Sequence, residues 1–256
     1  MRTRARATRG SRYKPTLWCA AVVGALLVAG VCPARAALTT PVCLAKKLHE
    51  WGNLRECQAR ENGKTLQAKP ADAAKCQTRF DAKLASLSAV AKAAALPCRY
   101  GVNGDGTVTD YDTGLQWEQK AADGSVHDVG NEYDWSPTLG RPDGTVFTEF
   151  LGTLNNATSR DGTTSSGCFT GHCDWRLPSI VELQTIVDAG APDCGNRGVC
   201  IDQTVFGPTI AFFYWSATTD TDFPVFAWGV AFGADGQVTS AIKEGTLFAR
   251  AVRSEL

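Results

Sequence analysis

The chain has 256 residues, with 26 Lys and Arg against 26 Asp and Glu, so its formal net charge is zero. This balance conceals a segregation of charge: residues 1–36 hold 7 basic and no acidic residues, residues 37–99 hold 11 basic and 5 acidic, and residues 100–256 hold 8 basic and 21 acidic. The acidic C-terminal part repels nucleic acid and sulfated polysaccharide, which both require clustered Lys and Arg, so the charge argues against any polyanion as its ligand.

The first predicted element is a signal peptide over residues 1–36. Basic residues precede an apolar run from Leu17 to Val31, and Ala34-Arg35-Ala36 offers a small-x-small cleavage site. The run has about 15 residues, short of the ~20 that a membrane-spanning helix needs. We therefore predict a cleaved leader and no retained membrane span, with a retained anchor as the alternative. The expected destination is the periplasm, the cell surface or the medium.

Residues 37–98 are predicted to form a helical hairpin, because the segment is rich in Ala, Leu, Lys, Gln and Glu. Two helices are expected at about 42–61 and 70–95, with a break near Glu61-Asn62-Gly63-Lys64. So small a hairpin buries little core and needs covalent cross-links. A spacer or packing role suits it better than a binding role.

Eight cysteines follow the leader, and an even number in an exported protein favours disulfides over metal ligation. In antiparallel helices, Cys57 lies near Cys76 at the turn and Cys43 near Cys98 at the open end. This nested pattern, Cys43–Cys98 with Cys57–Cys76, is favoured over Cys43–Cys76 with Cys57–Cys98. The remaining pairs, Cys168–Cys173 and Cys194–Cys200, are close enough in sequence to be local loop clips.

Residues 99–256 form a second predicted domain, in which Asp-Gly pairs at positions such as 105, 123 and 143 indicate tight turns. Residues 120–170 are dominated by loops, with one short helix expected at 146–156. Strands are predicted at 213–218, 227–232 and 249–253. In the second of these, Trp228, Val230 and Phe232 alternate with small residues, which predicts one buried face.

The segment from Asp174 to Leu183 is the expected centre of this domain. An extended stretch stops at Pro178 and passes into a short amphipathic helix, with Ser179 as N-cap and Glu182 placed to close a capping box. Trp175 is predicted to lie in the core. Arg176 and Arg253 are expected to pair with acids such as Asp174 or Glu182.

Two candidate sites stand out among the polar loops. Trp135, with its neighbours Tyr133 and Asp134, lies in a polar loop and is the best candidate for an exposed aromatic that contacts a ligand. Asn103, Asp105 and Asp110 could offer oxygen ligands to Ca²⁺. A tight turn that opens a strand explains the same three residues, and we favour it, so no cofactor is expected.

Catalytic motifs are missing from the sequence. It contains no Gly-x-Ser-x-Gly, His-Glu-x-x-His, phosphate-binding loop or dinucleotide fingerprint, and His127 and His172 are isolated. We therefore expect the protein not to be an enzyme.

The order of motifs resembles a known family. Asp105-Gly106-Thr107-Val108-Thr109-Asp110 and Gly114-Leu115-Gln116-Trp117 are followed by Trp175-Arg176-Leu177-Pro178, Tyr214-Trp215-Ser216-Ala217-Thr218, Ala227-Trp228-Gly229-Val230-Ala231-Phe232 and Ala251-Val252-Arg253. Over residues of about 100–253 the chain is similar to the C-terminal domain of the Legionella collagen-like adhesin, a family long described as a domain of unknown function.

The resemblance implies an exported or surface-located bacterial domain with an α+β fold of the C-type-lectin-like or formylglycine-generating-enzyme-like kind, a twisted antiparallel sheet with long loops. The named adhesin binds host glycosaminoglycans and carries a collagen-like stalk, whereas this sequence has no Gly-x-y repeat and an acidic domain. A non-catalytic binding protein for a carbohydrate or protein ligand is the function expected here. One alternative is a relative or accessory of formylglycine-generating enzymes, although such an oxidase needs redox-active cysteines near its C-terminal strands and the last cysteine here is Cys200. The other alternative is a structural subunit of the envelope or of fimbriae.

Overall fold

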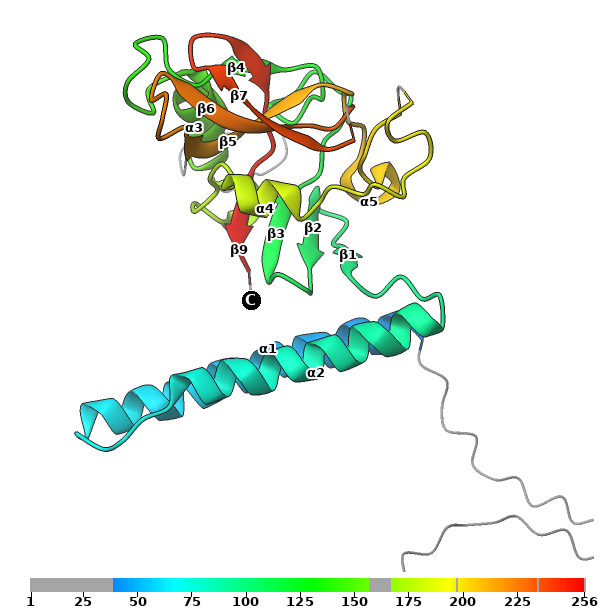
Figure 1. Cartoon of the computed structure of the whole chain (residues 1–256), viewed down its shortest axis with the longest axis vertical. Coiled ribbons are helices and arrows are strands. Elements are labelled where there is room, and N and C mark those ends of the chain that lie inside the picture. Colours follow the sequence, from blue (N-terminus) through cyan, green and yellow to red (C-terminus); the bar gives the residue numbers. More distant parts are fainter. Residues whose placement is uncertain (1–38, 157–166, 197, 234, 256) are drawn as a thin grey trace, which may run out of the picture. The chain divides into compact units, whose positions relative to one another are not determined.

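The computed structural model describes residues 39–156, 167–196, 198–233 and 235–255. The predicted signal peptide lies outside the described residues. A helical hairpin is followed by a mixed domain of helices and two sheets (Figure 1), which confirms the α+β class. None of the described helices combines the length and the apolar character needed to cross a bilayer.

The hairpin consists of α1 (Thr40–Leu66) and α2 (Ala73–Ala93). The predicted break at residues 61–64 is wrong, since α1 continues through Gly63 at a cost of about 1 kcal/mol relative to Ala. The chain turns instead around Pro70, which cannot occupy a helix interior. The next helix begins where the Asp72 carboxylate accepts a hydrogen bond from the backbone N–H of Lys75 at 3.0 Å.

The hairpin has a thin core of two small clusters, one of Cys43, Ala91 and Cys98 and the other of Leu54, Cys76 and Phe80. The disulfides within it are Cys43–Cys98 and Cys57–Cys76, which is the nested pattern. A small apolar core gains most from such cross-links.

The hairpin contacts the sheet domain through its own polar and aromatic side chains. Trp51 Nε1 donates a hydrogen bond to the Tyr111 carbonyl at 3.0 Å, and the buried Lys47 pairs with Asp112. The Trp51 ring lies so close to Gly114 that a Cβ there would approach it to 2.7 Å. Since Gly114 also has a φ of +73°, this position requires glycine on both counts.

The domain contains two sheets. The first has the order β1-β2-β3-β9 and is antiparallel, while the second has the order β4-β8-β5-β6-β7 and is antiparallel apart from the β5–β8 pair. The antiparallel prediction therefore holds for every strand pair except one. The strands are β1 (Tyr100–Val102), β2 (Thr107–Asp110), β3 (Leu115–Glu118), β4 (Glu132–Asp134), β5 (Phe213–Thr219), β6 (Phe226–Ala231), β7 (Gln237–Ile242), β8 (Thr246–Phe248) and β9 (Val252–Ser254).

Short helices connect the strands. The helix predicted at 146–156 begins as a π-helical turn and ends at residue 154. In α4, Ser179 and Glu182 form the predicted capping box through hydrogen bonds of 3.2 and 2.8 Å. The short helices are η1 (Val146–Phe150), α3 (Leu151–Leu154), η2 (Phe169–Gly171), α4 (Ile180–Gln184) and α5 (Gln203–Phe206).

Two large clusters of buried residues form the domain core. One contains Trp175 and Trp215, and the other joins Trp117 of the first sheet to Tyr214 of the second. Trp175 is 2% exposed, as predicted for a core residue, and its Nε1 donates a hydrogen bond to the Phe169 carbonyl at 3.0 Å.

The segment around Trp175 is also bound to the end of the chain. Arg176 and Val252 exchange two backbone hydrogen bonds of 2.9 Å, which joins the central segment to β9. The predicted ion pairs are present, with Arg176 bidentate on Glu182 at 2.7 and 2.8 Å and Arg253 on Asp174 at 2.8 Å.

Candidate binding surface

The predicted exposure of Trp135 is wrong, because this side chain is only 4% exposed. Its Nε1 donates a hydrogen bond to the Ser216 carbonyl at 3.0 Å, and the Lys243 ammonium lies 4.1 Å from the ring centroid. The polar residues just before it form strand β4, which pairs with β8, so the loop-like sequence is a strand at the edge of the second sheet. Tyr133 is 8% exposed, and Asp134 accepts a hydrogen bond from Thr145 Oγ1 at 2.6 Å.

The three residues considered for Ca²⁺ each have a partner within the chain. Asp105 accepts hydrogen bonds from the Thr107 N–H at 3.0 Å and from Thr107 Oγ1 at 2.6 Å, as the turn interpretation requires. Asp110 forms an ion pair with Arg99 at 2.7 Å, and the Asn103 amide donates to Thr107 and Thr109. The expectation that no cofactor is bound stays an untested prediction.

Within the described ranges, one group of His, Cys, Asp or Glu side chains lies close enough to hold a metal ion, namely Cys194, Cys200 and Asp235. Its two sulfurs are joined in a disulfide. A metal prefers thiolate ligands, so this group does not offer a built metal site.

A cluster of buried charges lies inside the domain. Glu118 is 0% exposed and accepts hydrogen bonds from Lys120 Nζ at 2.9 Å, His127 Nδ1 at 2.8 Å and the Ala251 N–H at 3.0 Å. Burial alone would raise the pKa of Glu118, but Lys120 and His127 outweigh it and hold that pKa below its usual value. Burial lowers the pKa of Lys120. Because these groups are sealed in the core, they tie β3 to the end of the chain rather than face a substrate.

An exposed apolar surface, which no sequence motif predicted, lies on β6 and β7. The register pairs Phe226 with Ile242, Trp228 with Ser240 and Val230 with Val238. Alternate residues of a strand share a face, so these side chains project from one side of the sheet. Helix α4 packs against β6, and Val230 is fully buried, whereas Trp228 and Phe226 are half-buried. The predicted buried face is therefore confirmed at Val230 and Phe232, whereas Trp228 is buried only in part.

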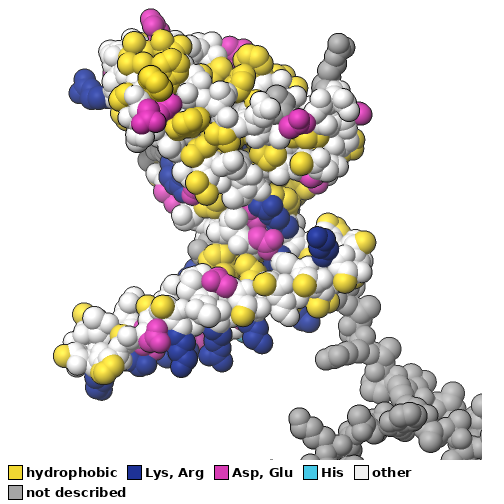
Figure 2. All heavy atoms as spheres, in the orientation of Figure 1, with side chains coloured by type: hydrophobic (Ala, Val, Ile, Leu, Met, Phe, Trp, Pro, Cys, Tyr) yellow, Lys and Arg dark blue, Asp and Glu magenta, His cyan; other side chains and the backbone are white. Residues whose placement is uncertain are grey.

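We call the uncovered part of this face the apolar ledge and define it by Phe223, Phe226, Trp228 and Ile242. Phe223 is 64% exposed and Ile242 is 44% exposed. The Phe223 and Phe226 rings meet edge to face with centroids 6.3 Å apart. Figure 2 shows hydrophobic side chains gathered over this edge of the domain, where β6 begins in Figure 1. A contiguous exposed apolar patch is a mark of an interaction site.

The loop that carries Phe223 is held in place by a buried carboxylate. Asp220 is 5% exposed and accepts hydrogen bonds from the N–H groups of Asp222 at 3.1 Å and Phe223 at 3.4 Å. Its own N–H donates to the Phe226 carbonyl at 3.0 Å, which closes the loop. An aromatic residue inside the polar run Asp220-Thr221-Asp222-Phe223 is the same kind of signal that singled out Trp135, and here it does mark an exposed ring.

Comparison with known proteins gives one family match. The family model described as the Lcl C-terminal domain matches residues 106–253, which is more than half of the chain. The hairpin and its two disulfides precede the matched range. Neither the curated proteins nor the solved structures contain a match to this chain.

Proposed function

Because the chain belongs to the Lcl C-terminal domain family, we propose that it is an exported, non-enzymatic protein that binds another protein at the bacterial surface through the apolar ledge. The observation that carries this proposal is the exposed Phe223 ring on a loop fixed by Asp220. The four disulfides support an exported location, because such bonds persist in oxidising compartments.

The chemistry of the ledge favours a protein partner over a carbohydrate. Sugar sites combine an aromatic platform with several polar groups that fix the hydroxyls. The ledge instead joins two phenylalanines, a tryptophan and an isoleucine, the residue types that form the apolar centre of protein interfaces. Strands β6 and β7 and the loop fixed by Asp220 hold these side chains in place, so little ordering cost opposes binding.

Two features support the non-enzymatic part of the proposal. The acid and base groups of the interior, Glu118, Lys120 and His127, are at most 5% exposed and cannot touch a substrate. The eight cysteines of the described residues are all in disulfides, so none is a free thiol for formylglycine-type oxidation.

The test is adsorption of the labelled, purified chain to bacterial envelopes, compared between two pairs of substitutions. Phe223→Ser with Ile242→Ser removes the two most exposed side chains of the ledge. Val102→Ser with Ile210→Ser removes two exposed apolar side chains elsewhere, at 51% and 39% exposure. We expect saturable adsorption that the ledge pair lowers by about tenfold or more, because central apolar anchors dominate interface energies. The control pair leaves it unchanged.

Treatment of the envelopes identifies the kind of partner. Protease treatment is expected to abolish adsorption, while periodate oxidation of glycans leaves it intact. The opposite pattern would show that the ledge binds carbohydrate. Equal adsorption by the two substituted pairs would show that the ledge has no part in binding.

A further inference from the structure

The hairpin carries a second surface of a different kind, made of basic side chains. On α2, Lys75, Arg79 and Lys83 are exposed and follow one another at four-residue intervals, so they line one side of the helix. At 3.6 residues per turn, Arg79 lies about 180° around the helix from Ser88. Ser88 Oγ contacts Asp112 of the sheet domain at 3.5 Å. The three cations therefore project away from the domain.

Helix α1 contributes three further cations to the same side. Lys46, Arg60 and Lys64 are exposed and lie on the side of α1 opposite Trp51, which contacts Tyr111 of the domain. We call these six residues, three from each helix, the basic face. Figure 2 shows Lys and Arg side chains in a row along one long edge of the hairpin.

Most of this charge is not neutralised within the chain. Arg60 pairs with Glu56 at 3.6 Å, and both side chains are well exposed, while Lys64 pairs with Glu61 at 2.6 Å. Lys46, Lys75, Arg79 and Lys83 form no ion pair with any described residue. Residues 37–99 as a whole hold 11 basic against 5 acidic residues.

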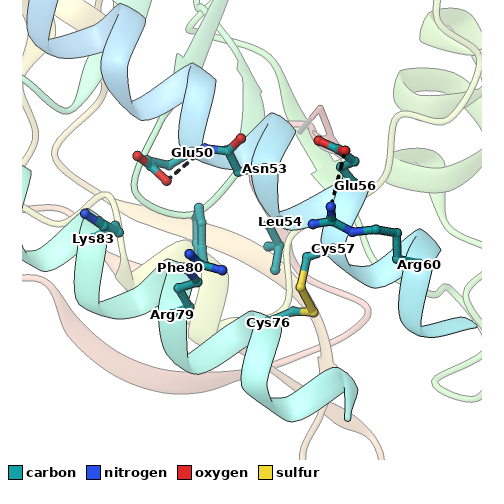
Figure 3. A pocket seen from close by; sticks show the side chains of 10 residues that line it. All are labelled: Glu50, Asn53, Leu54, Glu56, Cys57, Arg60, Cys76, Arg79, Phe80 and Lys83. Carbon is teal, nitrogen blue, oxygen red and sulfur yellow. Dashed lines mark hydrogen bonds and ion pairs between the residues drawn. A yellow bond between two sulfur atoms is a disulfide. The ribbon is translucent and has the colours of Figure 1, made fainter. Parts of the chain in front are cut away.

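The groove between the helices shows what kind of anion this face suits. It has a volume of about 370 Å³ and is lined by Arg60, Arg79 and Lys83, but also by Glu50 and Glu56 (Figure 3). In Figure 3 the two carboxylates lie on α1, across from Arg79 and Lys83 on α2. Carboxylates in the groove oppose the binding of one compact phosphate there, because like charges repel.

The cations are instead spread along the helices. Lys46 and Lys64 are 18 residues apart in one helix, which corresponds to roughly 27 Å. Such an extended row matches an extended array of negative charge. Val90, seven residues after Lys83 and therefore on the same side of α2, is 53% exposed and adds an apolar contact at the edge of the face.

We propose that the basic face docks the hairpin on an anionic phospholipid surface, with both helices parallel to the bilayer plane. Each Lys or Arg near an anionic leaflet adds to the electrostatic attraction, so several act together. Residues 100–256, with 8 basic and 21 acidic residues, are repelled by the same surface. Charge therefore orients the chain, with the hairpin on the lipid and the sheet domain held away from it.

The test is co-sedimentation of the full chain with vesicles of phosphatidylglycerol and phosphatidylcholine in equal parts, and with pure phosphatidylcholine. The variant Lys75→Gln/Arg79→Gln/Lys83→Gln removes three charges from the basic face. The control Arg55→Gln/Lys69→Gln/Lys92→Gln removes three charges from outside it. Gln has a helix propensity close to that of Lys and Arg, and circular dichroism verifies the helices of both variants.

We expect the chain to bind the anionic vesicles and not the neutral ones, with affinity that falls as salt is added. The basic-face variant is expected to lose tenfold or more in vesicle affinity, and the control less than threefold. Equal losses in the two variants, or no binding by the unsubstituted chain, overturn the proposal.

Two further outcomes would assign the face to another occupant and also overturn the proposal. One is tight binding of soluble polyphosphate without binding to anionic vesicles. The other is a salt-sensitive dimer in sedimentation, abolished by the basic-face variant, which would place the acidic domain of a second copy on the hairpin. Loss of envelope adsorption in the ledge variant alone leaves the basic face intact, so the two proposals fail separately.

Discussion

The hairpin and the sheet domain reach a folded state by different means. Six buried residues in two clusters form the hairpin core, and three of them are cysteines. The domain buries clusters of 14 and 12 residues, rich in aromatic rings and free of cysteine. Its disulfides close short loops, with sequence separations of 5 and 6, whereas those of the hairpin span 55 and 19. Disulfides therefore contribute much of the stability of the hairpin, whereas apolar burial contributes most of the stability of the domain.

The largest effect is expected when the domain loses an aromatic core residue. Trp175→Ala removes a ring that is 2% exposed and contacts Phe169 with centroids 5.0 Å apart. The cost is about 3–5 kcal/mol of unfolding free energy, read from urea denaturation followed by near-ultraviolet circular dichroism. Phe80→Ala in the hairpin should melt helix and leave the domain signal in place. A domain that keeps its midpoint without Trp175 contradicts this division.

Removal of disulfides is expected to separate the two regions next. In the chain-entropy model, loss of Cys43–Cys98 costs about 4 kcal/mol and loss of Cys57–Cys76 about 3, against about 2 for either loop clip in the domain. Paired Cys→Ser variants followed by amide hydrogen exchange should show hairpin amides losing protection first. The prediction is contradicted if domain amides lose more protection in the Cys168→Ser/Cys173→Ser variant than helix amides lose in the hairpin variants.

Acid is expected to weaken the domain through Glu118. Its pKa is lowered in the folded state, so the stability it contributes is present above the unfolded value of 4.5 and is lost as pH falls through the folded value. Unfolding free energy measured between neutral pH and the acid range should fall more steeply for the unsubstituted chain than for Glu118→Gln. The exposed Glu132→Gln serves as control and keeps the steep slope. A slope unchanged by Glu118→Gln contradicts the prediction.

The smallest effect concerns glycine. A Cβ on Gly63, inside α1, meets no atom within 4 Å, so Gly63→Ala should raise hairpin stability by about 0.5–1 kcal/mol. In β6 a Cβ on Gly229 would lie 2.6 Å from the Tyr214 carbonyl oxygen, so Gly229→Ala should destabilise the domain. Thermal melts of the two variants should shift in opposite directions, and shifts of the same sign contradict this reading.

Features specified by neighbouring residues could be predicted from the sequence. Ser179 and Glu182 are three residues apart, and that spacing is sufficient for the capping box. The antiparallel geometry of two helices likewise selects the pairing of Cys57 with Cys76. The core position of Trp175 followed from its place in the extended stretch just before the helix start at Ser179.

The burial or exposure of a side chain could not be predicted where it depends on residues far away in the sequence. Trp135 is buried, in part because Lys243, far along the chain, lies over its ring. In β6, Val230 is fully buried and Trp228 only half-buried, although both lie on the same face of the strand. The exposure of the ledge likewise depends on which elements pack against β6, so the sequence of β6 alone does not reveal it. The two binding proposals therefore depend on tertiary arrangement, although the charge of the hairpin was visible in the sequence.

The position of β9 has a consequence for the order in which the chain can fold. Strand β3, built from residues 115–118, has β9 as its outer neighbour, and Arg176 reaches Val252 through two backbone hydrogen bonds. Synthesis proceeds from the N-terminus, so the ribosome must deliver residues up to Ser254 before this sheet is complete, whereas the hairpin needs the chain only up to Cys98. Truncation before β9 should therefore leave the helical hairpin joined to an incomplete, protease-sensitive sheet domain.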